Sequence, residues 1–598
     1  MKISRPHILA LLLCAAATSF AGEWESMPSA KTDARLAEVL QRLSPTDEVL
    51  AWVFFTDKGS HEFLKASVPH NVVSERSIQR RLKVRLLSDV VDYTDLPVEK
   101  SYVDQIAPHV NRVRQMSKWF NGVSVSATRN QIERLESLPF VAKTELLTRF
   151  KRNISEEELT SSPSSNTIQQ HKDNSLNSFD YGLSFAQVNQ INVPAVHNLG
   201  NYGQGVIIGV LDNGFRLLNH EAFDSLRLVA TYDFVDHKVS VVPNNPDPGF
   251  GAHGIITLSA IAGFKPGQLI GPAFGARYIL ARTENDSSET PLEEDNWLAA
   301  IEWADSLGVD VTSTSLGYLT YDPPYPSWTW EQMNGNTTVI TRAADMAVAR
   351  GIVVCNSAGN NGLNTVHNTL NAPADGDSVL SIGAVTIDGQ RANFSSVGPT
   401  TSVPARIKPD VMAQGVTVRC ASWTDPTQYT YSGGTSLSCP LAAGVAALLV
   451  HAKPSLTPVQ IANAMRQTAS RASTPDNLFG WGILNALSAV TSVGGLRTIP
   501  TTYSLLQNYP NPFNPKTTIQ YYLPQSSVVS LKIYNLLGQE VRTLVSAARE
   551  SSLKTIEWNG TNNSGNILAS GVYFARLNAK SIDNTISYTE IRKLVLSK

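Results

Sequence analysis

Cysteine is almost absent from this sequence of 598 residues, which contains four. One of them, Cys14, lies near the N-terminus, which leaves Cys355, Cys420 and Cys439 for the rest of the chain. Three cysteines exclude a disulfide framework as the main source of stability, and at least one thiol is unpaired in a monomer. No His/Cys cluster has the spacing of a zinc site, so each cysteine is interpreted as a small buried apolar residue.

An excess of charge of either sign is also lacking. The formal net charge is -2, with 17% of residues charged and 42% apolar. This balance gives no electrostatic reason to expect nucleic acid or anionic lipid, and we predict no nucleic-acid partner. The length is too great for one hydrophobic core and therefore predicts several domains.

The N-terminal apolar run is too short to cross a membrane. It extends from Ile8 to Ala17, whereas a spanning helix needs about 20 apolar residues. Two basic residues precede the run and small residues follow it, a pattern typical of a cleaved signal peptide. Residues 1–21 are therefore predicted to be removed during export, and the protein is predicted to be secreted.

A small α+β unit is predicted within residues 30–152. Glu48–Thr56 and Asn121–Ala127 have the composition and alternation of strands, and Val141–Leu147 has the pattern of a third. Between the last two, Gln131–Leu138 carries apolar residues at helical spacing. These strands and this helix are sufficient to form a separate compact domain.

Residues 153–179 are predicted to be an exposed linker. They are rich in Asn, Ser, Gln, Glu and Lys and contain almost no large apolar residue, so they bury too little surface to offset the entropy of ordering. Exposed polar linkers are the preferred sites of proteolytic cleavage. We therefore predict that the chain is processed in this linker.

Residues 180–493 alternate between short apolar strands and helical patterns, which predicts an α/β domain with a parallel sheet covered by helices on both faces. The strand candidates are Val206–Leu211, Arg277–Ala281, Val309–Thr314, Ile352–Cys355 and Val379–Val385. The helix candidates are Leu298–Leu307, Val339–Arg350 and Pro440–Ala452. After a linker at 494–502, alternating apolar residues and Gly/Asn/Pro turns predict a small β-sandwich over 503–598.

Three side chains in the α/β domain form a candidate catalytic set. Asp212 ends a buried strand, at the edge of a parallel sheet where open α/β folds place their chemistry. His253 begins a run of small and apolar residues that suits a packed helix, and imidazole is the usual proton carrier near neutral pH. Ser436 comes directly before an apolar helix, whose first free N–H groups favour a developing oxyanion.

Each of these residues also has a structural interpretation when taken singly. Asp212 could cap a turn, His253 could be a core histidine, and Ser436 could cap a helix. Asn360, which follows the strand candidate ending at Cys355, lies in an Asn-Gly turn sequence of a common structural kind. Their occurrence together, in the chain order Asp, His, Asn, Ser, favours catalysis.

These motifs resemble the subtilisin-like (S8) serine peptidase family over about residues 181–489. The motifs are Val-Leu-Asp-Asn-Gly, His-Gly, Ser-Ala-Gly-Asn and Gly-Thr-Ser. The resemblance implies that Asp212 orients the imidazole and that His253 acts as general base and then acid. It further implies that Ser436 is the nucleophile and that Asn360 stabilises the oxyanion.

The same resemblance implies further site residues. Ser315, Leu316 and Gly317 are similar to the strand with which the family binds the substrate backbone. The family also has a calcium site, but the short loop between Gly263 and Gly271 holds no matching Asp/Asn cluster. We therefore assign no metal ligands and predict no cofactor, with calcium as an untested candidate.

The flanking regions resemble known accessory domains. The N-terminal unit is similar to the family's inhibitory pro-domain, notably at Asn121–Ser124 and Ile132–Glu136. The C-terminal region is similar to the sorting domain read by the type IX secretion system, notably at Gln507–Pro515 and Ala569–Tyr573. The resemblances together predict a monomeric, self-processing zymogen of a secreted serine endopeptidase, exported across an outer membrane. Its expected partners are protein substrates, its own pro-domain and the type IX secretion machinery.

Two other functions are compatible with parts of the sequence. An α/β-hydrolase esterase would carry G-x-S-x-G, but the sequence around Ser436 lacks the second glycine, and the acid precedes the serine. A non-catalytic surface adhesin could keep the fold and the C-terminal domain. The presence of Asp212, His253, Asn360 and Ser436 together argues against an adhesin.

Overall fold

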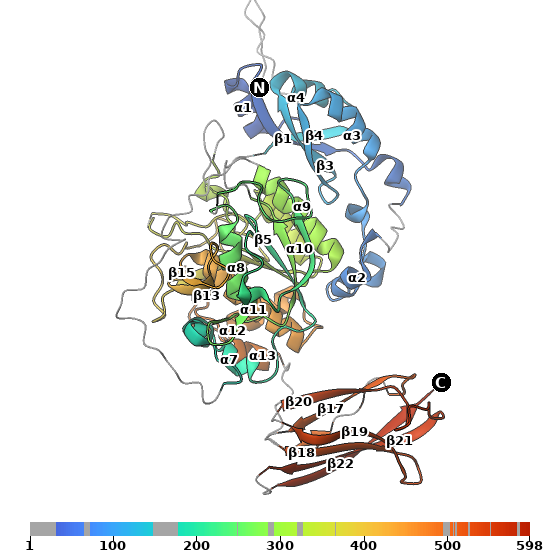
Figure 1. Ribbon diagram of the computed structural model, residues 1–598. Helices are drawn as coiled ribbons and strands as arrows, with labels where there is room; N and C mark the ends of the chain where they lie inside the picture. Colours follow the sequence, from blue (N-terminus) through green and yellow to red (C-terminus); the bar gives the residue numbers. More distant parts are fainter. Residues whose placement is uncertain are drawn as a thin grey trace, which may run out of the picture.

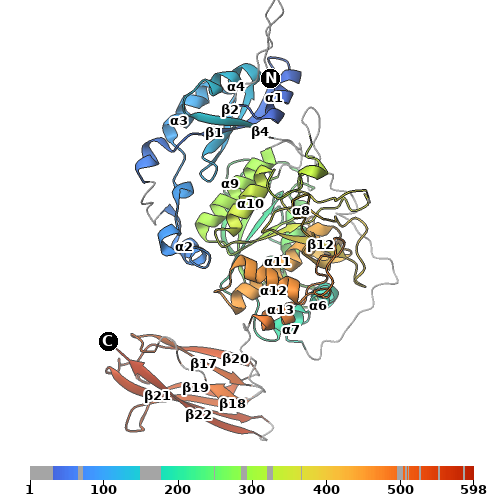
Figure 2. The same cartoon turned by 180° about the vertical axis from the view of Figure 1, so that it is seen from behind.

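The structure is a computed structural model that describes most of the chain. The described residues are 31–64, 72–147, 177–247, 249–284, 292–319, 327–364, 366–493, 503–505, 508, 511–523, 527–549, 552–582 and 586–597. The predicted signal peptide at 1–21, the linker at 153–179 up to residue 176, and the linker at 494–502 lie outside these residues. Figures 1 and 2 show an N-terminal domain, a central α/β domain and a C-terminal β domain.

The N-terminal domain is a four-stranded antiparallel sheet in the order β2-β3-β1-β4, with helices packed on one face. Its strands are β1 (Glu48–Phe55), β2 (Arg112–Ser117), β3 (Gly122–Thr128) and β4 (Val141–Leu146), and its helices include α1 (Ala34–Arg42), α3 (Lys100–Ile106) and α4 (Arg129–Glu136). A capping box between Thr128 and Gln131 begins α4 directly after β3. The predicted strands and helix of this unit are confirmed.

A segment between β1 and α3 was not recognised in the sequence. It contains α2 (Glu75–Arg81), which begins after the N-cap Ser74. Its basic residues gave no apolar period to indicate a helix. Its arginines donate hydrogen bonds to main-chain carbonyls of the central domain.

The central domain contains a seven-stranded sheet in the order β13-β12-β11-β10-β5-β9-β6, with every neighbouring pair parallel. The strands are β5 (Ile207–Asp212), β6 (Arg227–Asp233), β9 (Arg277–Arg282), β10 (Val311–Thr314), β11 (Val353–Ser357), β12 (Leu380–Val385) and β13 (Val411–Gln414). The five predicted strands are confirmed to within two residues. The two missed strands lie at the sheet edges, where β6 is half-exposed and β13 is short.

Helices cover both faces of this sheet. One face carries α8 (Ala252–Ala262) and α11 (Thr435–Ala452), and the other carries α9 (Leu292–Leu307) and α10 (Val339–Val348). Alternation along β5 divides its side chains, with Ile208 and Val210 in one core and Ile207 and Leu211 in the other. The smaller helices are α6 (Phe185–Gln190), α7 (Val193–His197), α12 (Pro458–Gln467) and α13 (Ala486–Ser492).

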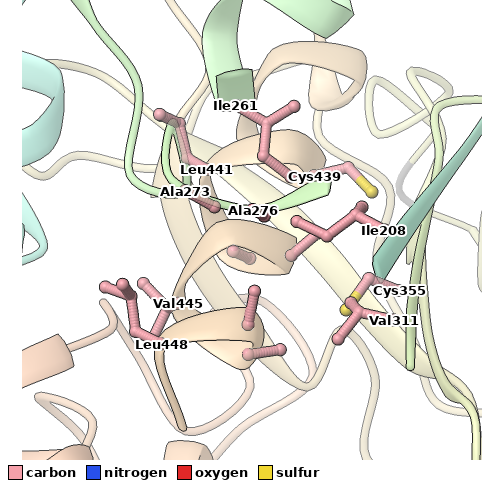
Figure 3. Packing of buried hydrophobic residues seen from close by; sticks show 14 of the residues in the cluster. Ile208, Ile261, Ala273, Ala276, Val311, Cys355, Cys439, Leu441, Val445 and Leu448 are labelled. Carbon is pink, nitrogen blue, oxygen red and sulfur yellow. The ribbon is translucent and has the colours of Figure 1, made fainter. Parts of the chain in front are cut away.

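Helix α11 runs through the middle of the larger core. Figure 3 shows Leu441, Val445 and Leu448 of this helix among apolar side chains from the sheet and α8. By length and composition α11 could cross a membrane, but almost all of it is buried inside the protein. The helix approaches its neighbours so closely that a Cβ on Gly444 would lie 2.3 Å from Pro272 Cγ. This packing fixes the position of the helix N-terminus, where Ser436 lies.

The C-terminal domain is built from two antiparallel sheets that enclose one apolar core, as the sandwich prediction requires. One sheet has the order β16-β17-β20 and the other the order β19-β18-β21-β22. The strands are β16 (Ser504–Leu505), β17 (Thr517–Leu523), β18 (Ser527–Tyr534), β19 (Glu540–Arg549), β20 (Ser552–Trp558), β21 (Gly571–Ser581) and β22 (Ser587–Leu596). In both whole-molecule views this domain lies at the opposite end from the N-terminal domain.

The N-terminal sheet packs on α9 and α10 of the central domain. Strand β1 is buried on both faces: Val49, Ala51 and Val53 face its own helices, whereas Leu50 and Trp52 share a cluster with α9 and α10. An antiparallel sheet normally leaves one face to solvent. Burial of both faces shows that this domain is shaped to cover another surface.

Candidate active site

Asp212 is the last residue of β5 and lies at the carboxyl edge of the parallel sheet. Its side chain is fully buried, and its carboxylate accepts hydrogen bonds from the adjacent backbone and from α8. The Asn213 N–H donates to Oδ1 at 2.8 Å, and Thr257 Oγ1 donates to Oδ2 at 2.9 Å. A buried carboxylate needs such donors, and they also fix its orientation.

His253 is the second residue of α8 and is also buried. Its Nδ1 lies 2.6 Å from Asp212 Oδ1. Because a carboxylate can only accept, Nδ1 carries the proton and Nε2 is the basic nitrogen of the neutral ring. The backbone of α8 begins in close contact with the turn after β5, since a Cβ on Gly254 would lie 2.1 Å from the Gly214 oxygen.

Ser436 lies in the first turn of α11, after Gly434, whose φ of +127° favours glycine. The residue is buried, and its carbonyl accepts a hydrogen bond of 2.7 Å from Ser315 Oγ. The N–H groups of a first helical turn have no partner within the helix and carry the positive end of its dipole. Helix α11 contacts α8, so the serine and the imidazole come from packed elements.

Asn360 is joined to the same helix terminus. Its Oδ1 accepts hydrogen bonds from both the N–H and the hydroxyl of Thr435, each at 2.9 Å. These two bonds fix the plane of the amide and leave Nδ2 as its donor end. The side chain of the residue before Ser436 therefore orients the predicted oxyanion donor.

The segment Ser315–Gly317 follows β10 and is held at several points. Asn356 Nδ2 donates to the Leu316 carbonyl at 2.9 Å, and a Cβ on Gly317 would lie 2.8 Å from Asn371 Cβ. Its contact with Ser436 places the segment beside the N-terminus of α11. A rigid extended segment at this position could bind a substrate backbone.

The arrangement can perform nucleophilic acyl transfer. A buried carboxylate holds an imidazole, and a serine hydroxyl lies at a helix N-terminus whose N–H groups favour an oxyanion. No group of three or more His, Cys, Asp or Glu side chains among the described residues is arranged to hold a metal ion. The three described cysteines are buried free thiols, and burial raises the pKa of Cys439 to about 12.

Sequence reasoning missed the residues that support this site. Thr257 and Thr435 bind Asp212 and Asn360, yet Thr257 is an ordinary helix residue in the sequence, and Thr435 was given no role of its own within the Gly-Thr-Ser motif. Thr257 lies four residues after His253, which puts both on one side of α8. That spacing was the available signal, but it becomes informative only once Asp212 is known to face the same side.

Three family profiles match different parts of the chain. The subtilase family matches residues 203–482, and the peptidase S8 propeptide domain of Bacteroidota matches residues 50–166. The FlgD Ig-like domain matches residues 514–583. The match to an Ig-like domain agrees with the two antiparallel sheets of the C-terminal domain.

Individual proteins are similar to the central part of the chain. Subtilisin DY of Bacillus licheniformis is 30% identical over 309 residues, which cover 52% of this chain and 97% of that protein. Subtilisin NAT of Bacillus subtilis subsp. natto is 27% identical over 388 residues, which cover 64% of this chain and 85% of that protein. A solved structure of a protease from Pseudoalteromonas arctica is 23% identical, with a TM-score of 0.42, covering 52% of this chain and 99% of that chain.

The hydroxyl of Thr257 offers a direct test of the site. Thr257→Val removes the hydrogen bond to Asp212 Oδ2 at almost constant volume, leaving a buried carboxylate oxygen without this donor. We expect the turnover number on a peptide substrate to fall roughly tenfold with KM nearly unchanged. Thr257→Ser keeps the hydroxyl and should retain the wild-type turnover number. Steady-state kinetics make the comparison, and equal turnover numbers for the two variants would show that the hydroxyl of Thr257 does not support catalysis.

Proposed function

The chain belongs to the subtilase family of serine peptidases, and from this premise we propose that it is an exported, self-processing endopeptidase with Asp212, His253 and Ser436 as its catalytic triad. Hydrolysis of peptide bonds follows from family membership. The observation that carries the residue roles is the buried 2.6 Å contact between His253 Nδ1 and Asp212 Oδ1 at the sheet edge. The serine of the Gly-Thr-Ser motif lies on α11, which packs against α8, the helix that carries the histidine.

In the proposed mechanism Ser436 Oγ attacks the scissile carbonyl while His253 Nε2 accepts its proton. Asp212 stabilises the imidazolium that forms and keeps Nδ1 protonated, so that Nε2 exchanges the proton. His253 then donates that proton to the leaving amine, which gives an acyl-enzyme and the first product. Water attacks the acyl-enzyme by the same proton transfers and regenerates Ser436.

The tetrahedral intermediates carry negative charge on the former carbonyl oxygen. Two donors are proposed to stabilise it, the N–H of Ser436 in the first turn of α11 and Nδ2 of Asn360. The fixed amide plane of Asn360 supports this role, because a donor that is already oriented needs no reorganisation during the reaction. Ser315, Leu316 and Gly317 are proposed to align the substrate backbone beside Ser436.

The N-terminal domain is proposed to inhibit the enzyme until the linker is cut. Its last strand, β4, ends at Leu146, and Leu147 lies in the same apolar cluster as Leu316 and Tyr318. This cluster lies between the N-terminal sheet and the helices α9 and α10, and it extends to the proposed substrate-binding segment. We propose that the chain continues from Leu147 into the cleft and is cut by Ser436 between residues 153 and 179.

Features at the two ends of the chain support the proposal that the protein is exported. Residues 1–21 have the pattern of a signal peptide, and the C-terminal domain follows the peptidase as a separate Ig-like unit. We propose that the type IX secretion machinery recognises this domain, that the protein acts outside the cell or at its surface, and that the peptidase works as a monomer on protein substrates without a cofactor.

Self-processing can be tested by mass. The Ser436→Ala chain loses the proposed nucleophile and should keep its full mass during incubation, whereas the wild-type chain should be cut in the linker. Intact-mass spectrometry of both proteins after identical treatment makes the comparison. Equal cleavage of the two chains would show that another protease cuts the linker or that Ser436 is not the nucleophile.

The oxyanion role of Asn360 predicts an effect on turnover alone. Removal of one such donor costs roughly 10² to 10³ in turnover in enzymes of this class, and we expect Asn360→Ala to fall in that range with KM within threefold. Thermal unfolding of the variant supplies the control, because loss of the bonds to Thr435 also affects the start of α11. If the loss of kcat in Asn360→Ala were fully explained by a smaller folded fraction of the variant, the assignment of Asn360 as an oxyanion donor would be wrong.

Two buried carboxylates at the interface make propeptide binding sensitive to pH. Glu302 of α9 accepts hydrogen bonds from Ser117 Oγ at 2.5 Å and from the N–H groups of Lys118 and Trp119 at 3.1 and 3.2 Å. Burial raises the pKa of Glu302 to about 7 and that of Asp295 to about 6. Both carboxyl groups bind protons more tightly in the complex than a glutamate or aspartate exposed to water.

The complex should therefore weaken as pH rises, because ionisation above the ordinary carboxyl pKa favours the separated state. The measured quantity is the Kd between the propeptide and the peptidase domain in a nicked chain. The nicked chain is Ser436→Ala protein that has been cut at a protease site engineered into the linker. We expect Kd to rise tenfold or more between about pH 5 and pH 8, and Glu302→Gln to remove more than half of the logarithmic slope. Gel filtration and titration at each pH measure it; a slope unaffected by Glu302→Gln would contradict the prediction.

A further inference from the structure

The segment that contains α2 contacts the peptidase domain far from the catalytic residues. Figures 1 and 2 show α2 away from the N-terminal sheet, beside the ends of α9 and α10. The backbone of the segment is joined to α9 by the Ser74 N–H, which donates to the Ser306 carbonyl at 3.2 Å. Its side chains toward the peptidase are mainly basic.

Arginines of this segment bind main-chain carbonyls where α9 and α10 end. Arg80 Nε donates to the Arg350 carbonyl at 3.0 Å, and its Nη1 donates to the Val309 carbonyl at 2.7 Å. Arg76 Nε donates to the Gly308 carbonyl at 3.0 Å. These carbonyls follow the last residues of α9 and α10, and Arg80 Nη1 also donates to the Asp305 carbonyl, in the last turn of α9, at 3.4 Å. The last carbonyls of a helix lack partners within it and carry the negative end of its dipole, so a guanidinium group supplies both donors and charge at this position.

A single aspartate of α9 joins the paired arginines. Asp305 accepts hydrogen bonds from both Arg80 and Arg81, and all three side chains are almost completely buried. Asp95 of the N-terminal domain binds Arg81 through both oxygens, at 2.7 and 2.8 Å, which orients the guanidinium toward Asp305. Asp310 pairs with Arg76 at the edge of the same contact.

The peptidase surface is shaped for this contact as well as charged for it. Gly308 and Gly351 have φ of +84° and +91°, and they follow the ends of α9 and α10. A Cβ on Gly308 would lie 2.7 Å from Arg76 Cγ, and one on Gly351 would lie 2.8 Å from the Arg80 carbonyl. The two glycines therefore end the helices and also allow the segment to approach.

One peptidase cation takes part, and it faces the N-terminal domain. Arg350 is buried, its guanidinium lies 4.3 Å from the ring centroid of Trp119, and Nη2 donates to Thr94 Oγ1. It also lies 3.8 Å from Asp92. The N-terminal domain thus supplies an aromatic face and acceptors for this arginine, so that the charges are matched on both sides of the contact.

We propose that Asp305, Gly308, Val309, Asp310 and the Arg350 carbonyl form a guanidinium-binding surface, separate from the cleft, whose partner is the paired-arginine helix α2 of the propeptide. This surface holds the propeptide on the peptidase after the linker has been cut. The proposal rests on the proposed function in one respect, that the N-terminal domain is a propeptide separated by cleavage. As a consequence, cleavage of the linker alone does not release the propeptide from the peptidase, because α2 remains bound to this surface.

The test removes the several N–H donors of each guanidinium group in α2 but keeps the positive charge of each side chain. In the nicked chain, Arg80→Lys with Arg81→Lys retains two positive charges but cannot bridge Asp305, Asp95 and the carbonyls. We expect Kd for the propeptide to rise at least ~100-fold, since buried charges lose their partners. The matched control is Arg129→Lys with Arg134→Lys on α4, which should change Kd less than threefold. A Kd within threefold of wild type for the α2 variant would overturn the proposal.

A variant on the other side of the contact keeps the test independent of propeptide folding. Asp305→Asn leaves the propeptide sequence intact and should raise Kd by a similar factor. The processed Asp305→Asn enzyme should hydrolyse a small chromogenic peptide with kcat/KM within twofold of wild type, because this surface lies outside the cleft. Unchanged propeptide affinity in Asp305→Asn would overturn the proposal. The binding measurement uses Ser436→Ala protein, so a wrong assignment of the nucleophile would appear only in the activity and self-processing experiments.

Discussion

Burial of helix α11 is the constraint on which the site depends. The helix is apolar on nearly every side and contacts four sheet strands, α8 and two further helices, so its axis has little freedom to shift. Ser436 lies at its N-terminus and Asn360 is bound to its first residue. A displacement of the helix would therefore move the proposed nucleophile and the proposed oxyanion donors together, and the core that resists such a displacement also maintains the geometry of the candidate site.

The two faces of the parallel sheet contact different parts of the protein. Alternation along β5 directs Ile208 and Val210 toward α8 and α11, which carry the candidate site residues His253 and Ser436, and Ile207 and Leu211 toward α9 and α10. The N-terminal sheet covers α9 and α10 with Trp52 and other apolar side chains. The described part of the propeptide therefore binds a broad surface formed by α9 and α10, on the opposite face of the sheet from α8 and α11.

Polar groups buried beneath the propeptide bind it and are expected to influence its release. Glu302 accepts three hydrogen bonds from one turn of the propeptide, whereas Asp305 and two helix ends accept from its arginines. Water must satisfy these acceptors once the propeptide leaves, and ionised carboxylates are solvated well by water. Burial raises the pKa of Glu302, so ionisation of Glu302 is expected to favour separation, whereas Asp305 is paired with the arginines while the propeptide is bound.

The sequence by itself determined the three-domain order, the parallel sheet and the residues of the candidate site. These features rest on short-range signals: apolar runs of strand length, glycine-containing turns after Asp212 and before Ser436, and a family motif at each site residue. The tertiary structure alone decided the contacts of Thr257 with Asp212, of Thr435 with Asn360, and of Arg80 and Arg81 with Asp305. Each of the last pair is separated from its partner by more than two hundred residues, and a polar residue in a sequence does not reveal which distant buried charge or helix end will need it.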